Sequence, residues 1–279
     1  MRREILNVAM FTLFGGVGSM IVFKLDKVII NQMLDLSNTG VYTIAFYFGS
    51  LVVMPSRPLL KISGTLIADA WKKNDIKTIK NIYYKSCLNQ LLIGGFLFLG
   101  IWANIDNILI ILGDEYTAAK WVIFFIGLGY LFDMATGANG QIIVLSKYYR
   151  INLVFLSVLV VLMIILMYLL IPLWGITGAA IAVTVSLVVN NLLRSAFLHQ
   201  KFNLQPFNKK NALVVIIYSL IYLITIQFSF DNLALNLIFK SSVVFILSVL
   251  SFGFIFPVSE EANSIINDFI KKYIKKSDD

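Results

Sequence analysis

A long apolar segment without a charge constrains what this chain can fold into. Residues 154–170 contain no charged or amide side chain, and only Ser157 and Tyr168 carry a hydroxyl group. Consecutive apolar positions are typical of a helix in lipid, whereas the strands of a transmembrane β-barrel alternate apolar and polar residues. Because about 20 apolar residues span the hydrocarbon core of a bilayer as a helix, the segment predicts a transmembrane helix.

The composition of the whole chain agrees with lipid as its solvent. Of the 279 residues, 59% are hydrophobic and 14% are charged, whereas about 25% are charged in an average soluble domain. The net charge of +8 would suggest nucleic-acid binding in a soluble protein. In a membrane protein it is typical of cytoplasmic loops rich in Lys and Arg, so we predict no nucleic-acid partner.

Residue types that build metal sites or nucleophilic active sites are rare in this chain. There is one cysteine, Cys87, and one histidine, His199, so no disulfide framework and no cluster of transition-metal ligands is expected. No Gly-rich phosphate loop and no serine nucleophile elbow occurs in the sequence. The sequence therefore predicts no metal, no cofactor and no enzymatic activity.

Apolar runs between charged or turn-forming segments predict an all-α polytopic membrane protein with about eight transmembrane helices. The runs cover approximately residues 8–34, 39–62, 83–103, 119–145, 150–171, 176–198, 211–229 and 233–257.

The charges between these runs predict an orientation. Lys and Arg gather near the N-terminus and in residues 72–85, 147–150, 201–210 and 271–276, whereas the alternate connections are acidic or nearly uncharged. Since cytoplasmic loops of membrane proteins carry the excess of Lys and Arg, the basic set is expected inside. Both termini are then cytoplasmic, and the number of spans is even.

Two basic segments outside the spans carry apolar residues at helical spacing. We expect a surface helix over about residues 67–84 and a similar one over 262–274 in the basic C-terminal tail, both lying on the inner membrane surface. The alternative is that each is a solvated basic linker with a few apolar residues.

The first predicted span contains three charged residues, Lys24, Asp26 and Lys27. A charge inside a span costs about 2.5–3.5 kcal/mol on insertion scales, so it usually faces a cavity or a partner. Lys24 and Lys27 share one helical stripe with Asn31, which suggests a cavity-facing anion site. The alternative is an ion pair that neutralises Asp26 and fixes helix packing. Asp26 is also a candidate for ion coupling.

The second predicted span combines prolines with cations. Pro55 and Pro58 flank Arg57, and Lys61 follows one turn later. Proline removes backbone hydrogen bonds, and membrane helices tolerate this where protein or a water-filled cavity satisfies the freed groups. We expect a kink that lines an aqueous path, with Arg57 and Lys61 as cavity residues. The alternative is that both cations extend to the inner interface.

The fourth predicted span carries a carboxylate near its middle. Asp133, Thr136 and Asn139 recur at helical spacing, which places Asn139 among the cavity residues and makes Asp133 a second candidate for ion coupling. A salt bridge from Asp133 to Lys24 or Lys27 is the plain alternative.

A stripe of small and polar residues runs along the sixth predicted span. Gly178, Ala182, Ser186, Asn190 and Arg194 follow one another at intervals of four. Small residues let membrane helices approach closely, and polar ones bond across the interface. We interpret the stripe mainly as a packing surface; the alternative is that Asn190 and Arg194 lie at the inner mouth of the cavity.

The order of several motifs resembles the polysaccharide-exporting flippases of the multidrug/oligosaccharidyl-lipid/polysaccharide (MOP) superfamily, of the O-antigen flippase type. The motifs that carry the resemblance are Leu25–Lys27, Thr39–Ala45, Leu112–Tyr116, Ala118–Ala119, Asn139–Gln141, Ser146–Lys147 and, most specifically, Leu170–Ala182.

The resemblance implies a partial protein. Such flippases have two pseudo-symmetric lobes of six helices, and the motif order here matches the second lobe followed by two extra helices. The implied domains are a transmembrane lobe at 1–205 and two additional helices with the basic tail at 206–279. The first lobe is absent, so a separate N-terminal lobe or polysaccharide assembly proteins are implied partners.

The resemblance also implies a function, namely alternating-access transport of a polyprenyl-diphosphate-linked oligosaccharide across the bacterial cytoplasmic (inner) membrane. Lys24, Lys27 and Arg57 would then face the diphosphate, and membrane lipid would surround the chain. Two alternatives remain: a cation-coupled drug exporter of the same superfamily, which favours an acidic aromatic cavity, and a membrane-embedded polymerase or ligase, which needs a substantial outward loop.

Overall fold

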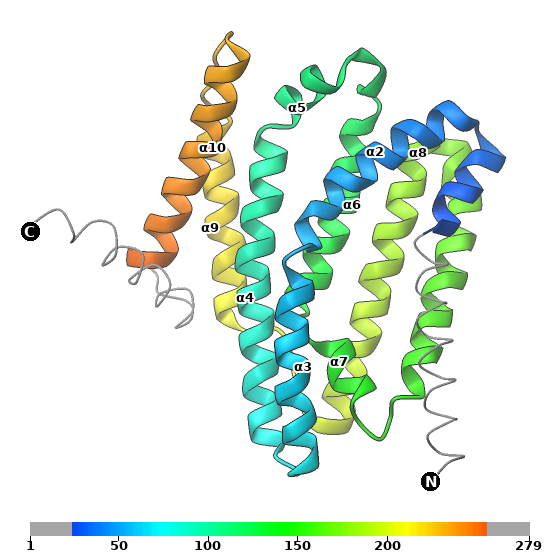
Figure 1. Ribbon diagram of the computed structural model, residues 1–279, viewed down its shortest axis with the longest axis vertical. Helices are drawn as coiled ribbons and strands as arrows, with labels where there is room; N and C mark the ends of the chain where they lie inside the picture. Colours follow the sequence, from blue (N-terminus) through cyan, green and yellow to red (C-terminus); the bar gives the residue numbers. More distant parts are fainter. Residues whose placement is uncertain (1–23, 256–279) are drawn as a thin grey trace, which may run out of the picture.

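The computed structural model describes residues 24–255, and this part of the chain is a bundle of helices without a strand. Most of the helices run roughly parallel to the long axis of the molecule (Figure 1). Helical residues 24–33 come first, and the remaining elements are α2 (Leu36–Ser50), η1 (Leu51–Val53), α3 (Ser56–Lys72), α4 (Ile76–Ala103), α5 (Ile105–Leu112), η2 (Asp114–Tyr116), α6 (Ala119–Ala135), α7 (Asn139–Val144), α8 (Ile151–Phe202), α9 (Lys209–Thr225), α10 (Leu233–Val249) and η3 (Leu250–Ile255).

The predicted second span, 39–62, is not one continuous helix, because it is interrupted near Pro55. α2 passes into the short 3-10 helix η1, and α3 starts at Ser56 directly after Pro55. Proline is favoured at helix starts because its missing N–H needs no partner there. The kink is anchored by the buried Ser56 hydroxyl, which donates a 2.6 Å hydrogen bond to the Gln90 side chain on α4. The predicted kink is therefore present.

The segment predicted as a surface helix over 67–84 differs in the structure. α3 continues to Lys72, a tight turn follows with Asn74 at φ 52°, and α4 begins at Ile76. Asparagine tolerates this left-handed conformation better than most residues. The apolar residues of the segment face the neighbouring helix rather than a membrane surface, and Ile67, Ile79 and Tyr83 are fully buried. The predicted helix at 262–274 lies outside the described residues.

α8 is one long element with a reversal inside it. Trp174 and Gly175 leave the helical conformation, with Gly175 at φ 54°, and the two arms run side by side in opposite directions (Figure 1). The reversal falls between the predicted spans 150–171 and 176–198. Gly178 makes the turn possible, because a Cβ there would lie 2.2 Å from the Leu170 carbonyl oxygen.

The first arm of α8 has one buried and one exposed apolar face. Phe155, Leu159, Met163 and Met167 are buried against the bundle. The opposite face exposes the apolar side chains Val154, Val158, Val161, Ile165 and Leu169. A continuous exposed apolar face is typical of a surface that meets lipid.

Three buried clusters hold the helices together. The first joins α2, α6 and both arms of α8, and the third joins α3, α4 and α7. The second cluster packs α9 and α10 against α4, through residues such as Leu88, Val214 and Val244. Tyr218 on α9 strengthens that contact by donating a 2.7 Å hydrogen bond to the Leu92 carbonyl.

Within residues 24–255, four segments are long and apolar enough to cross a membrane: Leu36–Val53, Ile76–Ala103, Ile151–Phe202 and Leu233–Gly253. The third contains the reversal of α8, so it supplies two antiparallel arms. α6 and α9 have 17 residues each, or about 25 Å of helix. The described residues thus form a helical membrane protein, and the full number of eight spans stays a prediction.

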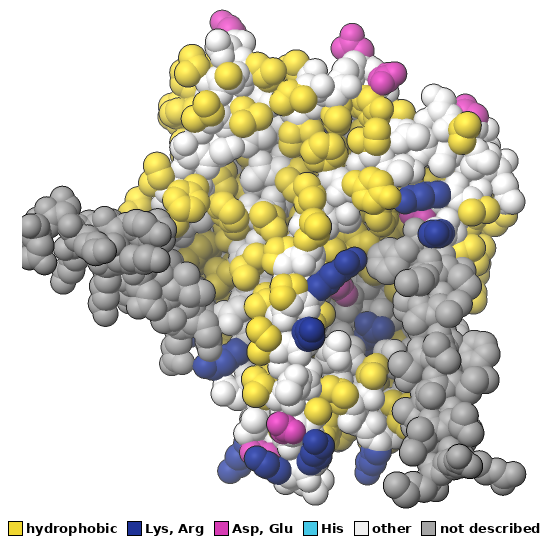
Figure 2. Space-filling view, viewed as in Figure 1, with side chains coloured by type: hydrophobic (Ala, Val, Ile, Leu, Met, Phe, Trp, Pro, Cys, Tyr) yellow, Lys and Arg dark blue, Asp and Glu magenta, His cyan; other side chains and the backbone are white. Residues whose placement is uncertain are grey.

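Charged side chains separate toward the two ends of the bundle. The exposed carboxylates of Asp35, Asp114 and Glu115 lie at one end, which we call the acidic end, and the α3–α4 turn with its lysines marks the basic end. Figure 2 shows carboxylates at the acidic end and Lys or Arg side chains together with some carboxylates at the basic end, with hydrophobic side chains covering much of the surface between the ends.

Candidate functional site

Asp26 is held by hydrogen bonds rather than by an ion pair. Its side chain is 2% exposed; one oxygen accepts a 3.1 Å hydrogen bond from the Tyr42 hydroxyl and the other a 2.8 Å bond from the Lys27 backbone N–H. Burying a carboxylate is costly unless hydrogen bonds satisfy it. Among the described residues no ion pair joins Asp26 to Lys24 or Lys27.

The Lys27 ammonium group lies over two aromatic rings. The Lys27 ammonium lies 4.9 Å from the ring centroid of Tyr47 and 5.3 Å from that of Phe46. Such cation–π contacts hold a cation without neutralising it. Lys24 is exposed. The alternative, an ion pair that neutralises Asp26, is therefore not found among the described residues.

A network of amide and hydroxyl groups surrounds Asp133 on α6. Asn191 from α8 donates a 2.8 Å hydrogen bond to the Asp133 carboxylate. The side-chain oxygen of Asn191 accepts hydrogen bonds from the Thr136 hydroxyl at 2.9 Å and from the Asn139 side-chain amide at 2.8 Å. One asparagine thus ties α6, α7 and α8 together. The salt bridge proposed as an alternative, from Asp133 to Lys24 or Lys27, is not formed.

Arg194 lies close to this network from the second arm of α8. Its guanidinium donates a 3.1 Å hydrogen bond to the Asn152 side chain, and its charge acts on Asp133. The Nε atom is buried without a hydrogen-bond partner in the described residues. The arginine comes near the backbone at Gly140, where a Cβ would lie 3.2 Å from the guanidinium. Arg194, at the end of the predicted packing stripe, therefore lies beside the polar network and bonds to Asn152.

Arg57 and Lys61 are exposed on α3. No ion pair of either cation with a carboxylate is found in the described part of the chain. The buried Tyr130 side chain lies in the same region as Asp26, Asp133 and Arg57. Figure 2 shows that Lys and Arg side chains also occur along the middle of this face, beside carboxylates and between the two charged ends.

The structure arranges the predicted residues in two clusters and an exposed pair. Asp26 and Lys27 belong to the first cluster, Asp133 and Asn139 to the second, and Arg57 and Lys61 to α3. Sequence reasoning missed Tyr42, Asn191 and Tyr130. Asn191 could have been found as an amide one position from the polar stripe, but nothing in the local sequence singles out Tyr42 as the partner of Asp26.

The described residues contain no group of three or more His, Cys, Asp or Glu side chains that could hold a metal ion. Asp26 and Asp133 each lie among amide, hydroxyl and aromatic groups instead. What these surroundings offer chemically is a carboxylate that can gain or lose a proton, or contact a cation, beside exposed ammonium and guanidinium groups.

Comparison with known proteins finds similarity to a protein of an archaeon. The chain is 24% identical over 197 residues to a protein of Haloferax volcanii named "Probable low-salt glycan biosynthesis flippase Agl15"; the match covers 70% of this chain and 42% of that protein. The chain thus spans less than half the length of the relative. No protein-family model matches the chain. No solved structure matches it either.

Proposed function

We propose that this chain is the second lobe and C-terminal helices of a flippase that moves a lipid-linked oligosaccharide across the cytoplasmic membrane. The observation that carries the proposal is the set of exposed cations on this membrane protein, namely Lys24, Arg57 and Lys61. The carboxylates of Asp26 and Asp133 accept hydrogen bonds from Tyr42 and Asn191 instead of pairing with these cations. Similarity to a protein named as a glycan biosynthesis flippase supports it.

The charges suit a polyprenyl-diphosphate substrate. A diphosphate that crosses a region of low dielectric constant loses its hydration, and Lys or Arg partners offset part of that cost. Asp26 accepts from Tyr42 and from a backbone N–H, so it leaves the ammonium groups of Lys24 and Lys27 free of a neutralising ion pair. In this proposal Lys24, Lys27 and Arg57 bind the phosphates, and Lys61 extends the path toward the basic end.

The Asp133 network is the proposed coupling element. Its hydrogen bonds cross between α6, α7 and α8, so a change in the charge of Asp133 alters the contacts of three helices at once. Protonation or cation binding there would shift the balance between two arrangements of the lobe. Asp26, bonded to Tyr42 on α2, is the second candidate for that role.

The proposed orientation places the basic end and both termini in the cytoplasm. The proposed cargo is a precursor of surface polysaccharide, such as O-antigen in a bacterial inner membrane. A full path requires the complementary lobe, from the same longer protein or from a separate chain. No specific observation favours either a drug exporter or a membrane-embedded polymerase or ligase. The exposed charge within the bundle is basic, which disfavours the acidic cavity expected of a drug exporter.

A test is to replace Lys24 and Lys27 together by glutamine in the complete protein and to measure export of surface polysaccharide. We expect export to fall at least tenfold, with lipid-linked precursor accumulating inside the cell. The matched control is Lys72→Gln with Lys73→Gln, which removes the same charge at the exposed α3–α4 turn. Full export by the first variant at a normal protein level would contradict the proposed anion site.

A further inference from the structure

A second basic region lies away from the proposed transport site. At the basic end, a pocket of about 970 Å³ opens between the start of α4, the linker 203–208 and the start of α9. Lys77, Lys80 and Lys209 line it, and no Asp or Glu is among the lining residues. A pocket with three ammonium groups and no lining carboxylate favours an anion.

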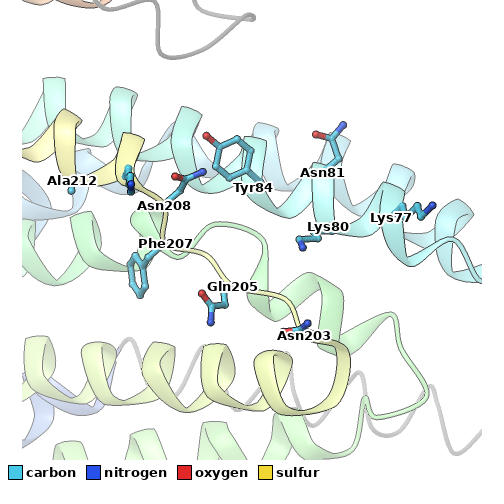
Figure 3. Close-up of a pocket in the computed structure, with 10 residues that line it drawn as sticks. Lys77, Lys80, Asn81, Tyr84, Asn203, Gln205, Phe207, Asn208 and Ala212 are labelled. Atoms are coloured by element: carbon cyan, nitrogen blue, oxygen red, sulfur yellow. The ribbon is translucent and has the colours of Figure 1, made fainter.

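Neutral hydrogen-bond donors complete the lining. Asn81 on α4 and Asn203, Gln205 and Asn208 on the linker also line the pocket, and the Gln205 amide nitrogen lies 3.3 Å from a ring nitrogen of His199. Figure 3 shows Lys80 pointing from α4 toward the linker that carries Gln205 and Asn203. Lysines on α4 and at the start of α9, with neutral amide side chains beside them, suit a phosphate group, which accepts several hydrogen bonds at once.

Asp75 is the carboxylate nearest to these lysines along the chain, and it has other partners. It interacts with Lys77, but its oxygens accept hydrogen bonds from the Thr78 backbone N–H at 3.0 Å and from the Thr78 hydroxyl at 2.7 Å. Asp75 therefore caps the N-terminus of α4. Lys80 and Lys209 have no ion pair with a carboxylate in residues 24–255.

An apolar strip leads out of the pocket along α9. Ala212 lines the pocket. Val215 and Ile216 follow three and four residues later, and Leu220 and Leu223 continue the same side of the helix. All four are more than half exposed, between 52% and 56%. This pocket therefore joins a charged site for a headgroup to an apolar surface that acyl chains can cover.

We propose that the pocket binds the phosphate headgroup of an anionic phospholipid, with its acyl chains lying along α9. A basic pocket between transmembrane helices is a recognised way to hold anionic lipid. With the basic end in the cytoplasm, the lipid belongs to the inner leaflet. The bound lipid would tie α9 to α4 at the point where their packing starts.

Native mass spectrometry of the purified chain with phosphatidylglycerol or phosphatidylcholine tests this proposal without any transport assay. We expect phosphatidylglycerol to be retained at least tenfold more tightly than phosphatidylcholine. Lys80→Gln with Lys209→Gln should weaken phosphatidylglycerol binding about tenfold. The control, Lys73→Gln with Lys201→Gln, removes two exposed lysines that do not line the pocket and should change it less than twofold.

Three results would overturn the proposal. Equal retention of the two lipids would show no anionic preference, and equal loss in both double variants would show a general effect of surface charge. If sodium phosphate at millimolar concentration displaced the lipid completely, the pocket would be a site for soluble phosphate. None of these outcomes bears on Lys24, Lys27 or Arg57, so the transport proposal stands or falls separately.

Discussion

At the scale of single residues, asparagine at position 191 has more partners than any predicted site residue. Its side chain donates to Asp133 and accepts from both Thr136 and Asn139. The neighbouring Asn190 is also buried, yet its side-chain oxygen has no hydrogen-bond partner in the described residues. Two adjacent asparagines thus provide a matched comparison within one helical turn.

Replacing Asn191 by leucine should destabilise the chain in detergent. The Asp133 carboxylate and the Asn139 amide each lose a buried partner, and an unsatisfied buried group costs about 1–3 kcal/mol. We expect a lower thermal midpoint, measured by intrinsic tryptophan fluorescence, and a loss of transport in the complete protein. Asn190→Leu should change the midpoint much less. If the two variants behave alike, the network does not contribute as the hydrogen bonds suggest.

At the scale of the elements, the connections decide how closely the helices pack. Gly137 joins α6 to α7 at φ 59°, and a Cβ there would lie 2.7 Å from the Cys87 backbone nitrogen. Both the backbone conformation and the contact with α4 therefore require glycine. By contrast, Gly100 lies inside α4 and has nothing within 4 Å of its Cβ position.

We expect Gly137→Ala to be destabilising by about 1–3 kcal/mol, since it adds a left-handed non-glycine residue and a backbone clash. The thermal midpoint should fall by several degrees. Gly100→Ala should leave it unchanged or raise it, because alanine is the better helix former. An unchanged midpoint for Gly137→Ala would mean that the α6–α7 connection rearranges freely.

The start of α4 should make stability depend on pH. Hydrogen bonds from Thr78 hold the pKa of Asp75 below its ordinary value. A carboxyl group whose pKa is lower in the folded state stabilises the folded protein at pH values above the pKa that it has in the unfolded state. This contribution is lost as the pH falls through the pKa of the folded state. We expect wild type to lose stability relative to Asp75→Ala below about pH 4, measured as the difference in thermal midpoint. A difference that stays constant from pH 6 to pH 3 would contradict this role.

At the scale of the whole molecule, the acidic and basic ends give an orientation that can be measured. Glu115 and Lys73 are exposed at opposite ends, and the native thiol of Cys87 is fully buried. We expect a cysteine introduced at position 115 to react with a membrane-impermeant maleimide in intact cells. A cysteine at position 73 should react only after permeabilisation. The opposite pattern would reverse the proposed orientation.

The sequence by itself determined the environment and the class of this protein. Long uncharged runs such as 154–170 and the segregation of lysines are local properties, so helices in lipid, the proline kink near residue 55 and the reversal near Gly175 could be predicted. Only the tertiary structure decided which partner each charge has. Asp26 meets Tyr42 and Asp133 meets Asn191 across helices. Residues 67–84 form the end of α3, a tight turn and the start of α4, because their apolar faces bury each other. Such contacts depend on how helices pack, and no local spacing specifies them.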